Sequence, residues 1–307
     1  MSKVVIVGSY VVDLMSRTPH MPSPGETVLG GPFRMGPGGK GSNQAVAAAR
    51  QGSEVTMVTK VGMDVFGNEA IKNFENEGID ATFVTRHPEE ATGAALITVD
   101  KQSENMIVVA LGACGKITNG DVLSAEKAFM DADIVLLQLE TSLEAIEKTV
   151  ALAKKYEKPI VLNPAPYQEI DENLLSGITY ITPNETEASL LTDINVEDEE
   201  SAKMASQRLI EKGINTVIIT LGKQGCFVYD GIDDGQLIKG FKVDAVDTTG
   251  AGDSFNGAFA TFIANGMDLD DAVNRANAVA ALSVTKVGTA PAMPFVNEVD
   301  RLMRGMD

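Results

Sequence analysis

Short apolar runs alternate with amphipathic segments over most of the chain. Runs rich in Val, Ile and Leu occupy residues 4–9, 54–62, 133–139, 159–164 and 216–222. Runs of this length, bounded by turn residues, are typical of buried strands. Segments with helical periodicity lie between them, such as residues 143–156. We therefore expect an α/β fold with a doubly wound, mostly parallel sheet flanked by helices.

Two stretches depart from this alternation. Residues 26–35 and 91–113 contain strand-like runs and turn signals with no helix between them, a pattern typical of antiparallel hairpins. We expect a small β-sheet lid formed by two insertions, at about residues 14–36 and 91–113, on a single domain that spans residues 1–307. The last third of the chain is expected to be mostly helical.

The composition is that of a folded globular protein. Of the 307 residues, 44% are hydrophobic and 22% are charged, which is far from the composition of disordered chains. No apolar run approaches the roughly 20 residues that cross a bilayer, and the run after the first three residues is too short for a signal peptide. We expect a cytoplasmic protein that does not bind membranes.

The charge balance is strongly acidic. Asp and Glu number 43 against 25 Lys and Arg, a net charge of −18, which disfavours binding to nucleic acid or to anionic membranes. A site for an anionic ligand therefore has to be built locally from backbone N–H groups, a few cations or a metal ion. Cys114 and Cys226 lie far apart, so their spacing supports neither a zinc site nor a disulfide framework.

Residues 36–44, GPGGKGSNQ, contain a formal G-x-G-x-x-G pattern. Pro37 interrupts it and no plain parallel strand precedes it, so a dinucleotide-binding motif is disfavoured. A P-loop is excluded as well, because Arg34 stands where its first glycine belongs. We interpret the segment as a loop that brings N–H groups, Lys40 and Asn43 to a helix start, where they suit a polyhydroxylated ligand. The alternative is a helix-entry loop whose glycines serve only tight packing.

Residues 246–255, VDTTGAGDSF, place Gly250, Ala251 and Gly252 just before a predicted helix. Unpaired N–H groups at a helix start favour a bound anion such as phosphate. Asp253 follows at once, and a carboxylate beside such an anion hole can take a proton from an attacking hydroxyl during phosphoryl transfer. The alternative for Asp253 is a plain N-cap.

Residues 182–187, TPNETE, form another junction between a strand and a helix. Asn184 either caps this helix, or Asn184, Glu185 and Glu187 organise water around Mg²⁺, which prefers oxygen ligands. Position alone leaves both interpretations open.

Taken together and in this order, these segments resemble the ribokinase family of ATP-dependent sugar and nucleoside kinases over essentially the whole chain. The resemblance implies a β-sheet lid that often forms a homodimer contact. It also implies transfer of the ATP γ-phosphoryl group to the 5-hydroxyl of a free pentose, with D-ribose as the first candidate. The matching segments are GSYVVD (8–13), PSPGETV (22–28), GPGGKGSNQAVAAA (36–49), LLQLE (136–140), LNPAP (162–166), TPNETE (182–187), TLGKQG (220–225), VDTTGAGDSFNG (246–257) and VTKVGTAPAMP (284–294).

The resemblance also implies roles for individual residues. Asp253 matches the general base, and Gly250, Ala251 and Gly252 match the anion hole. The sugar-contacting positions are Asp13, Gly39, Lys40, Asn43, Glu140 and Asp253, and the nucleotide-side positions are Asn184, Thr220, Gly222, Gly225, Gly252 and Asn277. The implied cations are Mg²⁺, on which Glu187 acts indirectly, and K⁺, held at Asp247, Thr249, Ser283, Lys286, Gly288 and Ala292.

One position departs from the family. Val11 stands where the family carries a sugar-contacting Asn. A valine cannot donate to a hydroxyl, and a buried unpaired hydroxyl costs about 1–3 kcal/mol, so 2-deoxyribose is the alternative substrate unless Val11 merely packs under the sugar. Fructose-kinase or nucleoside-kinase specificity, and a non-catalytic sugar or nucleotide sensor on the same fold, also remain as alternatives. A sensor would bind both ligands without releasing ADP.

Overall fold

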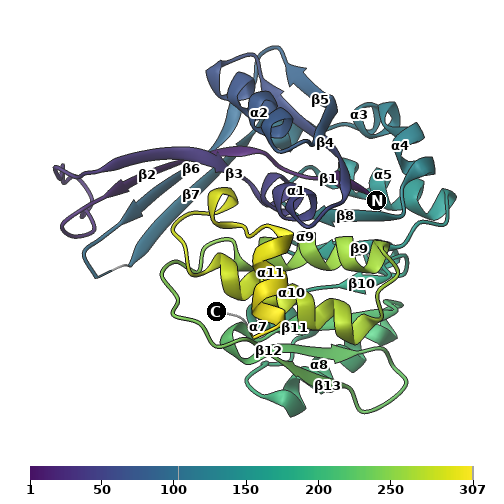
Figure 1. Ribbon diagram of the computed structural model, residues 1–307. Coiled ribbons are helices and arrows are strands. Elements are labelled where there is room, and N and C mark those ends of the chain that lie inside the picture. The colour runs from purple at the N-terminus through teal and green to yellow at the C-terminus, as the bar shows by residue number, and fades with distance from the viewer. Residues whose placement is uncertain (103, 306–307) are drawn as a thin grey trace.

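The computed structural model describes residues 1–102 and 104–305 and contains two β-sheets. Figure 1 shows the smaller sheet projecting from one side of the body that the larger sheet forms with its helices. The larger sheet has nine strands in the order β13-β12-β11-β10-β9-β8-β1-β4-β5. The bounds are β1 (Lys3–Val7), β4 (Glu54–Gly62), β5 (Asp80–His87), β8 (Ile134–Gln138), β9 (Ile160–Asn163), β10 (Tyr180–Ile181), β11 (Thr216–Thr220), β12 (Gly225–Tyr229) and β13 (Gln236–Lys239).

Neighbouring strands from β5 to β11 are parallel. Strand β12 pairs antiparallel with both β11 and β13. The five predicted buried strands are confirmed as β1, β4, β8, β9 and β11. In β1, Val5 and Val7 join one core while Val4 and Ile6 join the other. Both faces of the sheet are therefore buried, which explains why its strands read as unbroken apolar runs.

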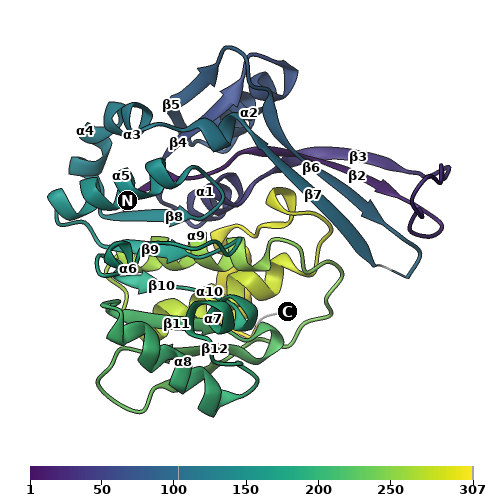
Figure 2. The ribbon, with the colours of Figure 1, turned by 180° about the vertical axis from the view of Figure 1, so that it is seen from behind.

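Helices cover both faces of the larger sheet, as Figures 1 and 2 show from opposite sides. One layer contains α1 (Lys40–Arg50), α2 (Val65–Asn76), α9 (Ala251–Ala264), α10 (Leu269–Ser283) and α11 (Val296–Met303). The other contains α3 (Asn119–Ser124), α4 (Glu126–Asp131), α5 (Leu143–Lys155), α6 (Glu172–Leu175), α7 (Glu185–Thr192) and α8 (Glu199–Glu211). Short 3₁₀ turns lie at η1 (Ala113–Lys116), η2 (Gly222–Gln224) and η3 (Ala290–Ala292). None of the described helices combines the length and apolarity needed to cross a membrane.

The smaller sheet is the predicted lid. Its strands are β2 (Val11–Arg17), β3 (Phe33–Gly38), β6 (Thr92–Val99) and β7 (Asn105–Gly112), in the order β3-β2-β6-β7. Each insertion supplies one antiparallel pair, and a parallel pairing of β2 with β6 joins the two.

The boundaries of the first insertion differ from those expected. It begins at Val11 rather than near residue 14, with a strand, β2, that was not expected. The strand-like run expected from residue 26 becomes a strand only at Phe33. The preceding Gly-Gly-Pro explains the late start, because Gly31 has a φ of 144° and Pro32 has no N–H for a ladder bond.

The helix layer brings α1 and α9 into close contact above the carboxyl ends of the parallel strands. A Cβ on Gly257 of α9 would lie 2.2 Å from the carbonyl oxygen of Gln44 in α1. Only a glycine permits this approach. The starts of both helices therefore meet at the strand ends, where open α/β sheets bind ligands.

Candidate active site

Asp253 lies in the first turn of α9 and is 7% exposed. The N-cap of α9 is Gly250, in the left-handed region with φ 78° and without a side-chain cap, so the N-cap interpretation of Asp253 is excluded. Its Oδ2 accepts a hydrogen bond of 2.9 Å from Nδ2 of Asn43, and its Oδ1 accepts one of 3.1 Å from Nε2 of Gln44. Two amides from α1 thus hold both oxygens of this carboxylate.

The start of α9 presents free backbone donors beside Asp253. Among the described residues, the N–H groups of Gly250, Gly252 and Asp253 find no acceptor. The N–H of Ala251 instead donates to the carbonyl of Thr248, at 3.3 Å. Nothing outside the helix backbone lies within 4 Å of a Cβ built on Gly252, and this residue is exposed. The start of α9 therefore borders open space at Gly252, as an anion site requires.

Glu140 links three segments of the site. It follows β8 and is 6% exposed, and its Oε2 accepts a hydrogen bond from Oγ of Ser9 and one of 2.8 Å from the N–H of Lys40. The end of β1, the end of β8 and the start of α1 therefore share one carboxylate.

Asp13 is a half-buried carboxyl group on β2. Oγ1 of Thr289 donates to it at 3.4 Å. Burial raises the pKa of Asp13 to about 7, and the nearby charges of Glu140 and Asp253 contribute to the rise. A Cβ on Gly38 would lie 2.1 Å from Oδ1 of Asp13, so a side chain at this position would displace the Asp13 carboxylate.

Lys40 is the cation of this acidic cluster. Burial of its ammonium group opposes the charge, but the carboxylates of Asp253, Glu140 and Glu187 outweigh this effect and raise the pKa of Lys40. Burial also raises the pKa of Glu187, and the charge of Asp253 adds to that rise. Lys40 therefore stays protonated and offsets part of the negative charge of the cluster.

Asn43 offers an unused acceptor. The side chain is 4% exposed, and its Nδ2 donates a hydrogen bond to Asp253. Its Oδ1 is buried without a partner among the described residues. A buried acceptor of this kind suits a ligand hydroxyl.

The glycines of the loop before α1 allow close backbone contacts. Gly39 has a φ of 88°, and a Cβ there would lie 2.8 Å from the backbone nitrogen of Val11. A Cβ on Gly41 would lie 2.6 Å from the carbonyl carbon of Gly8. Tight packing thus explains these glycines, and the same packing holds Lys40 and Asn43 in the site.

Val11 is 2% exposed and shares a face of β2 with Asp13, two residues further along the strand. Its register partners are Gly38 on β3 and Gly93 on β6. A Cβ on Gly93 would lie 2.8 Å from Cγ1 of Val11. The valine is therefore packed into the lid beside Asp13.

The expected nucleotide side lies at the ends of β10 and β11. Asn184 caps α7 through reciprocal bonds with Glu187, of 2.8 and 3.0 Å, and it forms a β-bridge with Thr220. Gly222 has a φ of 53° and open space where a Cβ would stand. Asn277 accepts a 3.0 Å bond from Sγ of Cys226, next to Gly225, so these residues form one group at the edge of the site.

The residues expected to hold a monovalent cation lie in the loop before α9, at the end of α10 and in the segment that follows α10. Oδ1 and Oδ2 of Asp247 accept bonds of 3.0 Å from the N–H groups of Thr249 and Gly288. Burial opposes ionisation of Asp247, but these N–H donors outweigh it and lower its pKa.

The backbone oxygens of these loops are the remaining donors for a cation. The carbonyls of Thr249, Lys286, Gly288 and Ala292 accept no backbone hydrogen bond from the described part of the chain. The side chain of Lys286 turns to Glu298, at 2.7 Å, and Oγ of Ser283 donates to the carbonyl of Ala280, at 2.8 Å. Free carbonyl oxygens are the donors that a hard cation requires.

Sequence reasoning assigned no role to several residues that complete the site. Gln44, Gln138 and Asn163 form a buried row of amides behind Asp253. Gln44 adjoins Asn43 directly before a run of small apolar residues, and a polar pair at the start of such a buried helix was the available signal. The partners of that pair come from strands far along the chain and carry no local signature.

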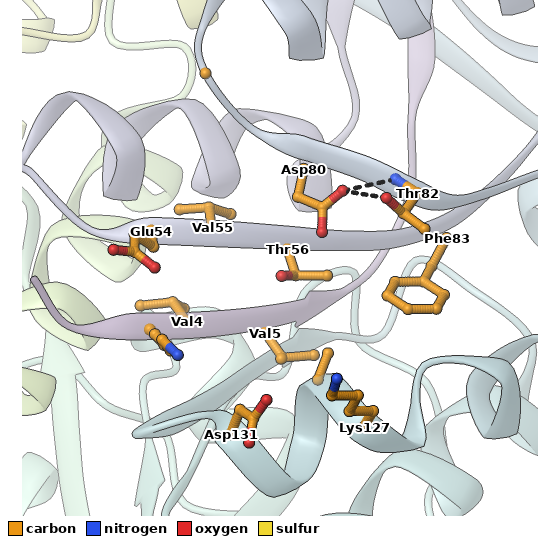
Figure 3. Close-up of a pocket in the computed structure, with 13 residues that line it drawn as sticks. Val4, Val5, Glu54, Val55, Thr56, Asp80, Thr82, Phe83, Lys127 and Asp131 are labelled. Carbon is orange, nitrogen blue, oxygen red and sulfur yellow. Dashed lines mark hydrogen bonds between the residues drawn. The ribbon is translucent and has the colours of Figure 1, made fainter.

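A separate pocket of about 460 Å³ lies at the amino ends of β1 and β4, opposite the site. Figure 3 shows Lys127 and Asp131 of α4 on one side of it and Asp80 on the other, with the carboxylate of Asp80 already bonded to Thr82. Charges of both signs line this pocket, and it contains no counterpart of the donors beside Asp253.

Comparison with known proteins agrees with this geometry. Residues 1–295 match the model of the pfkB family of carbohydrate kinases. The chain is 44% identical to a ribokinase of Haemophilus influenzae over 295 residues, covering 96% of each chain. It is 36% identical to a deoxyribokinase of Salmonella typhi over 301 residues, covering 98% of each. The solved structure of Arabidopsis thaliana ribokinase complexed with ribose and ATP is 28% identical, with a TM-score of 0.92 and 99% coverage of each chain.

Proposed function

Because the chain belongs to the pfkB family of carbohydrate kinases, we propose that it transfers the γ-phosphoryl group of ATP to the 5-hydroxyl of D-ribose. The observation that carries the proposal is the pairing of Asp253 with free N–H donors in one turn of α9. A base and an anion hole side by side suit the reaction of a hydroxyl with a phosphoryl group.

In this reaction Asp253 takes the proton of the 5-hydroxyl while that oxygen attacks the γ-phosphorus. The N–H groups of Gly250, Gly252 and Asp253 stabilise negative charge on the transferring group. The bond between the γ-phosphorus and the bridging oxygen breaks, and ADP leaves. The positions that would contact the sugar are Asp13, Gly39, Lys40, Asn43 and Glu140, and those on the nucleotide side are Asn184, Thr220, Gly222, Gly225 and Asn277.

The residues fit the two cations that the family implies. Mg²⁺ accompanies ATP and neutralises phosphate charge. Glu187, half-buried and close enough to Lys40 and Asp253 to influence their charges, would act on it through water. K⁺ would be held by the free carbonyl oxygens of the loops around Asp247 and Gly288, beside the anion hole.

The lid has the features of a homodimer surface. One of its faces carries Asp13, and the opposite face carries a row of apolar side chains across all four strands: Met35, Leu14, Leu96 and Val108. Met35 is 54% exposed, Leu96 53% and Val108 64%. A continuous exposed apolar sheet face marks an interaction surface, and we assign it to a second copy of the chain. We place the enzyme in the cytoplasm, where ATP is available.

One observation favours a second substrate, 2-deoxy-D-ribose. Val11 is an apolar side chain beside Asp13, on the sugar-facing side of the lid. An apolar group there matches a carbon that lacks its hydroxyl.

The test is ADP release with Mg-ATP and K⁺, with D-ribose and 2-deoxyribose compared side by side. A higher kcat/KM for D-ribose supports the main proposal, and a higher value for 2-deoxyribose supports the second. Val11→Asn then tests the role of this position, because an added amide should shift the preference toward ribose by roughly 10-fold. A shift toward 2-deoxyribose in that variant would contradict the role of Val11. Binding of both ligands without ADP release would indicate a sensor.

A further inference from the structure

Gln44 is fully buried at 0% exposure, and every polar atom of its side chain is in use. Its Nε2 donates to Oδ1 of Asp253 and to Oδ1 of Asn163, both at 3.1 Å. Its Oε1 accepts a 2.6 Å bond from Nε2 of Gln138. The Gln44 amide is therefore held from three directions.

A backbone carbonyl fixes the direction of these hydrogen bonds. Nδ2 of Asn163 donates to the carbonyl of Thr182 at 3.2 Å, and a carbonyl can only accept. Asn163 must therefore turn Oδ1 toward Gln44, and Gln44 must turn Nε2 toward Asn163 and Asp253. A flipped Gln44 would place acceptor against acceptor at both contacts.

Thr182, which follows β10, also holds the backbone of the anion hole. Oγ1 of Thr182 donates to Oδ1 of Asn256 at 2.5 Å, and Nδ2 of Asn256 donates to the carbonyl of Gly252 at 2.8 Å. The side chain of Asp253, through Gln44, and the turn that contains Gly252 are thus anchored to one buried polar network.

We propose that Gln44 is a positioning residue for phosphoryl transfer, which fixes the orientation of the Asp253 carboxylate by donating a hydrogen bond to its Oδ1. Asn43 holds the other oxygen from the sugar side. The inference rests on the proposed function, because it takes Asp253 as the base.

Other charged groups also act on Asp253. The charge of Asp253 helps to raise the pKa of Lys40 on α1, and it adds to the rise in the pKa of Asp13 on β2 and of Glu187 on α7. These three side chains are partly exposed, whereas Gln44 is sealed in the core. The hydrogen bond from Gln44 to Asp253 is therefore shielded from solvent.

The test compares Gln44→Met with Gln51→Met. Gln51 closes the same helix, is 5% exposed and donates a 2.8 Å bond to the carbonyl of Pro294, so the control removes a buried glutamine far from Asp253. The rate is followed as kcat at saturating D-ribose and ATP from about pH 5 to pH 9, which reports the groups of the ternary complex.

We expect Gln44→Met to lower kcat roughly 10- to 100-fold. The KM for D-ribose should stay within about 3-fold, since the only expected sugar position to which the Gln44 side chain bonds is Asp253 itself, and the other sugar contacts stay in place. The acid limb of the profile should move to higher pH by about one unit, because the carboxylate loses a donor to its charged form. Gln51→Met should keep the wild-type limb.

Gln44→Glu provides the second variant, because it keeps the shape of the side chain and replaces the donor by a carboxylate. Its acid limb should move further to higher pH than that of Gln44→Met. The inference is overturned if both Gln44 variants keep the wild-type limb and lose no more activity than Gln51→Met.

A readout without turnover separates this inference from the proposed function. The titration of the Asp253 carboxyl carbon is followed by NMR in the unliganded protein and assigned with Asp253→Asn. A midpoint at higher pH in Gln44→Met supports the inference even if no pentose is phosphorylated, an outcome that would contradict only the proposed function. An unchanged midpoint in a protein that phosphorylates ribose would overturn the inference alone.

Discussion

Asp13 shows how the ionisation of a single buried residue can oppose folding. Its pKa is raised from 3.8 to about 7, first by burial and then by the charges of Glu140 and Asp253. A carboxyl group with a raised pKa contributes stability that is present below its unfolded pKa and is lost as the pH rises through its folded pKa. In the unliganded protein, this contribution is therefore lost progressively between about pH 4 and pH 7.

Asp13→Asn removes this titration. From pH 4 to pH 8, we expect the free energy of unfolding of the variant to rise relative to that of the wild type by roughly 2–4 kcal/mol. Urea unfolding at both pH values measures the difference. An equal difference between the two proteins at pH 4 and pH 8 would contradict the assignment. The variant should also bind sugar more weakly, since it loses a charged acceptor.

At the scale of elements, the loop before α1 allows the backbone of α1 to lie very close to the end of β1. A Cβ on Gly41 would lie 2.6 Å from the carbonyl carbon of Gly8, whereas no atom lies within 4 Å of a Cβ on Gly36. The two glycines belong to the same motif, so they form a matched pair.

Gly41→Ala should push α1 away from the end of β1, destabilise the protein by about 1–3 kcal/mol and lower kcat/KM for sugar at least roughly 10-fold. Gly36→Ala should change the stability by no more than about 0.5 kcal/mol. Thermal unfolding and steady-state kinetics of both variants provide the measurement. Similar behaviour of the two would mean that close approach does not explain the motif.

Local pattern was sufficient to predict some elements and not others. The five buried strands are apolar runs covered on both faces, so composition alone marks them. Lid strand β2 was missed, because it begins in an apolar run directly after β1 and continues into half-exposed residues. The expected start of β3 was wrong for a different reason, since Pro32 and the glycines before it prevent pairing until Phe33.

The same distinction between local and non-local signals applies to the residues of the site. Asp253, its free N–H groups and Lys40 carry signals within a few residues of sequence. The order in which Gln138, Gln44 and Asn163 donate and accept depends on strands joined only in the folded sheet. The pKa shift of Asp13 likewise arises from burial and from charges more than 100 residues away.

At the scale of the whole molecule, the lid has one face that carries Asp13 and an opposite, outer face that carries Leu14 and Met35. Figure 2 shows its strands extending beyond the helical body. Val108 on the outer face is 64% exposed, and Val65 at the start of α2 is 62% exposed. These two valines therefore offer the same substitution on and off the proposed dimer surface.

We expect a homodimer by light scattering, and we expect Val108→Glu to weaken it by roughly 10-fold or more, because the substitution buries an unpaired charge at the contact. Val65→Glu should leave the protein a dimer by the same measurement. A monomeric wild type, or equal dissociation of both variants, would contradict the assignment of this face.

The central claim is that Asp253 deprotonates the sugar hydroxyl within a kinase site. The most direct test is ADP release with D-ribose by Asp253→Asn, together with calorimetric binding of ribose and of ATP to the same variant. We predict a fall in kcat of roughly 10²- to 10⁴-fold with sugar and nucleotide affinities kept within about 10-fold. Turnover close to that of the wild type, with both ligands bound, would contradict the account.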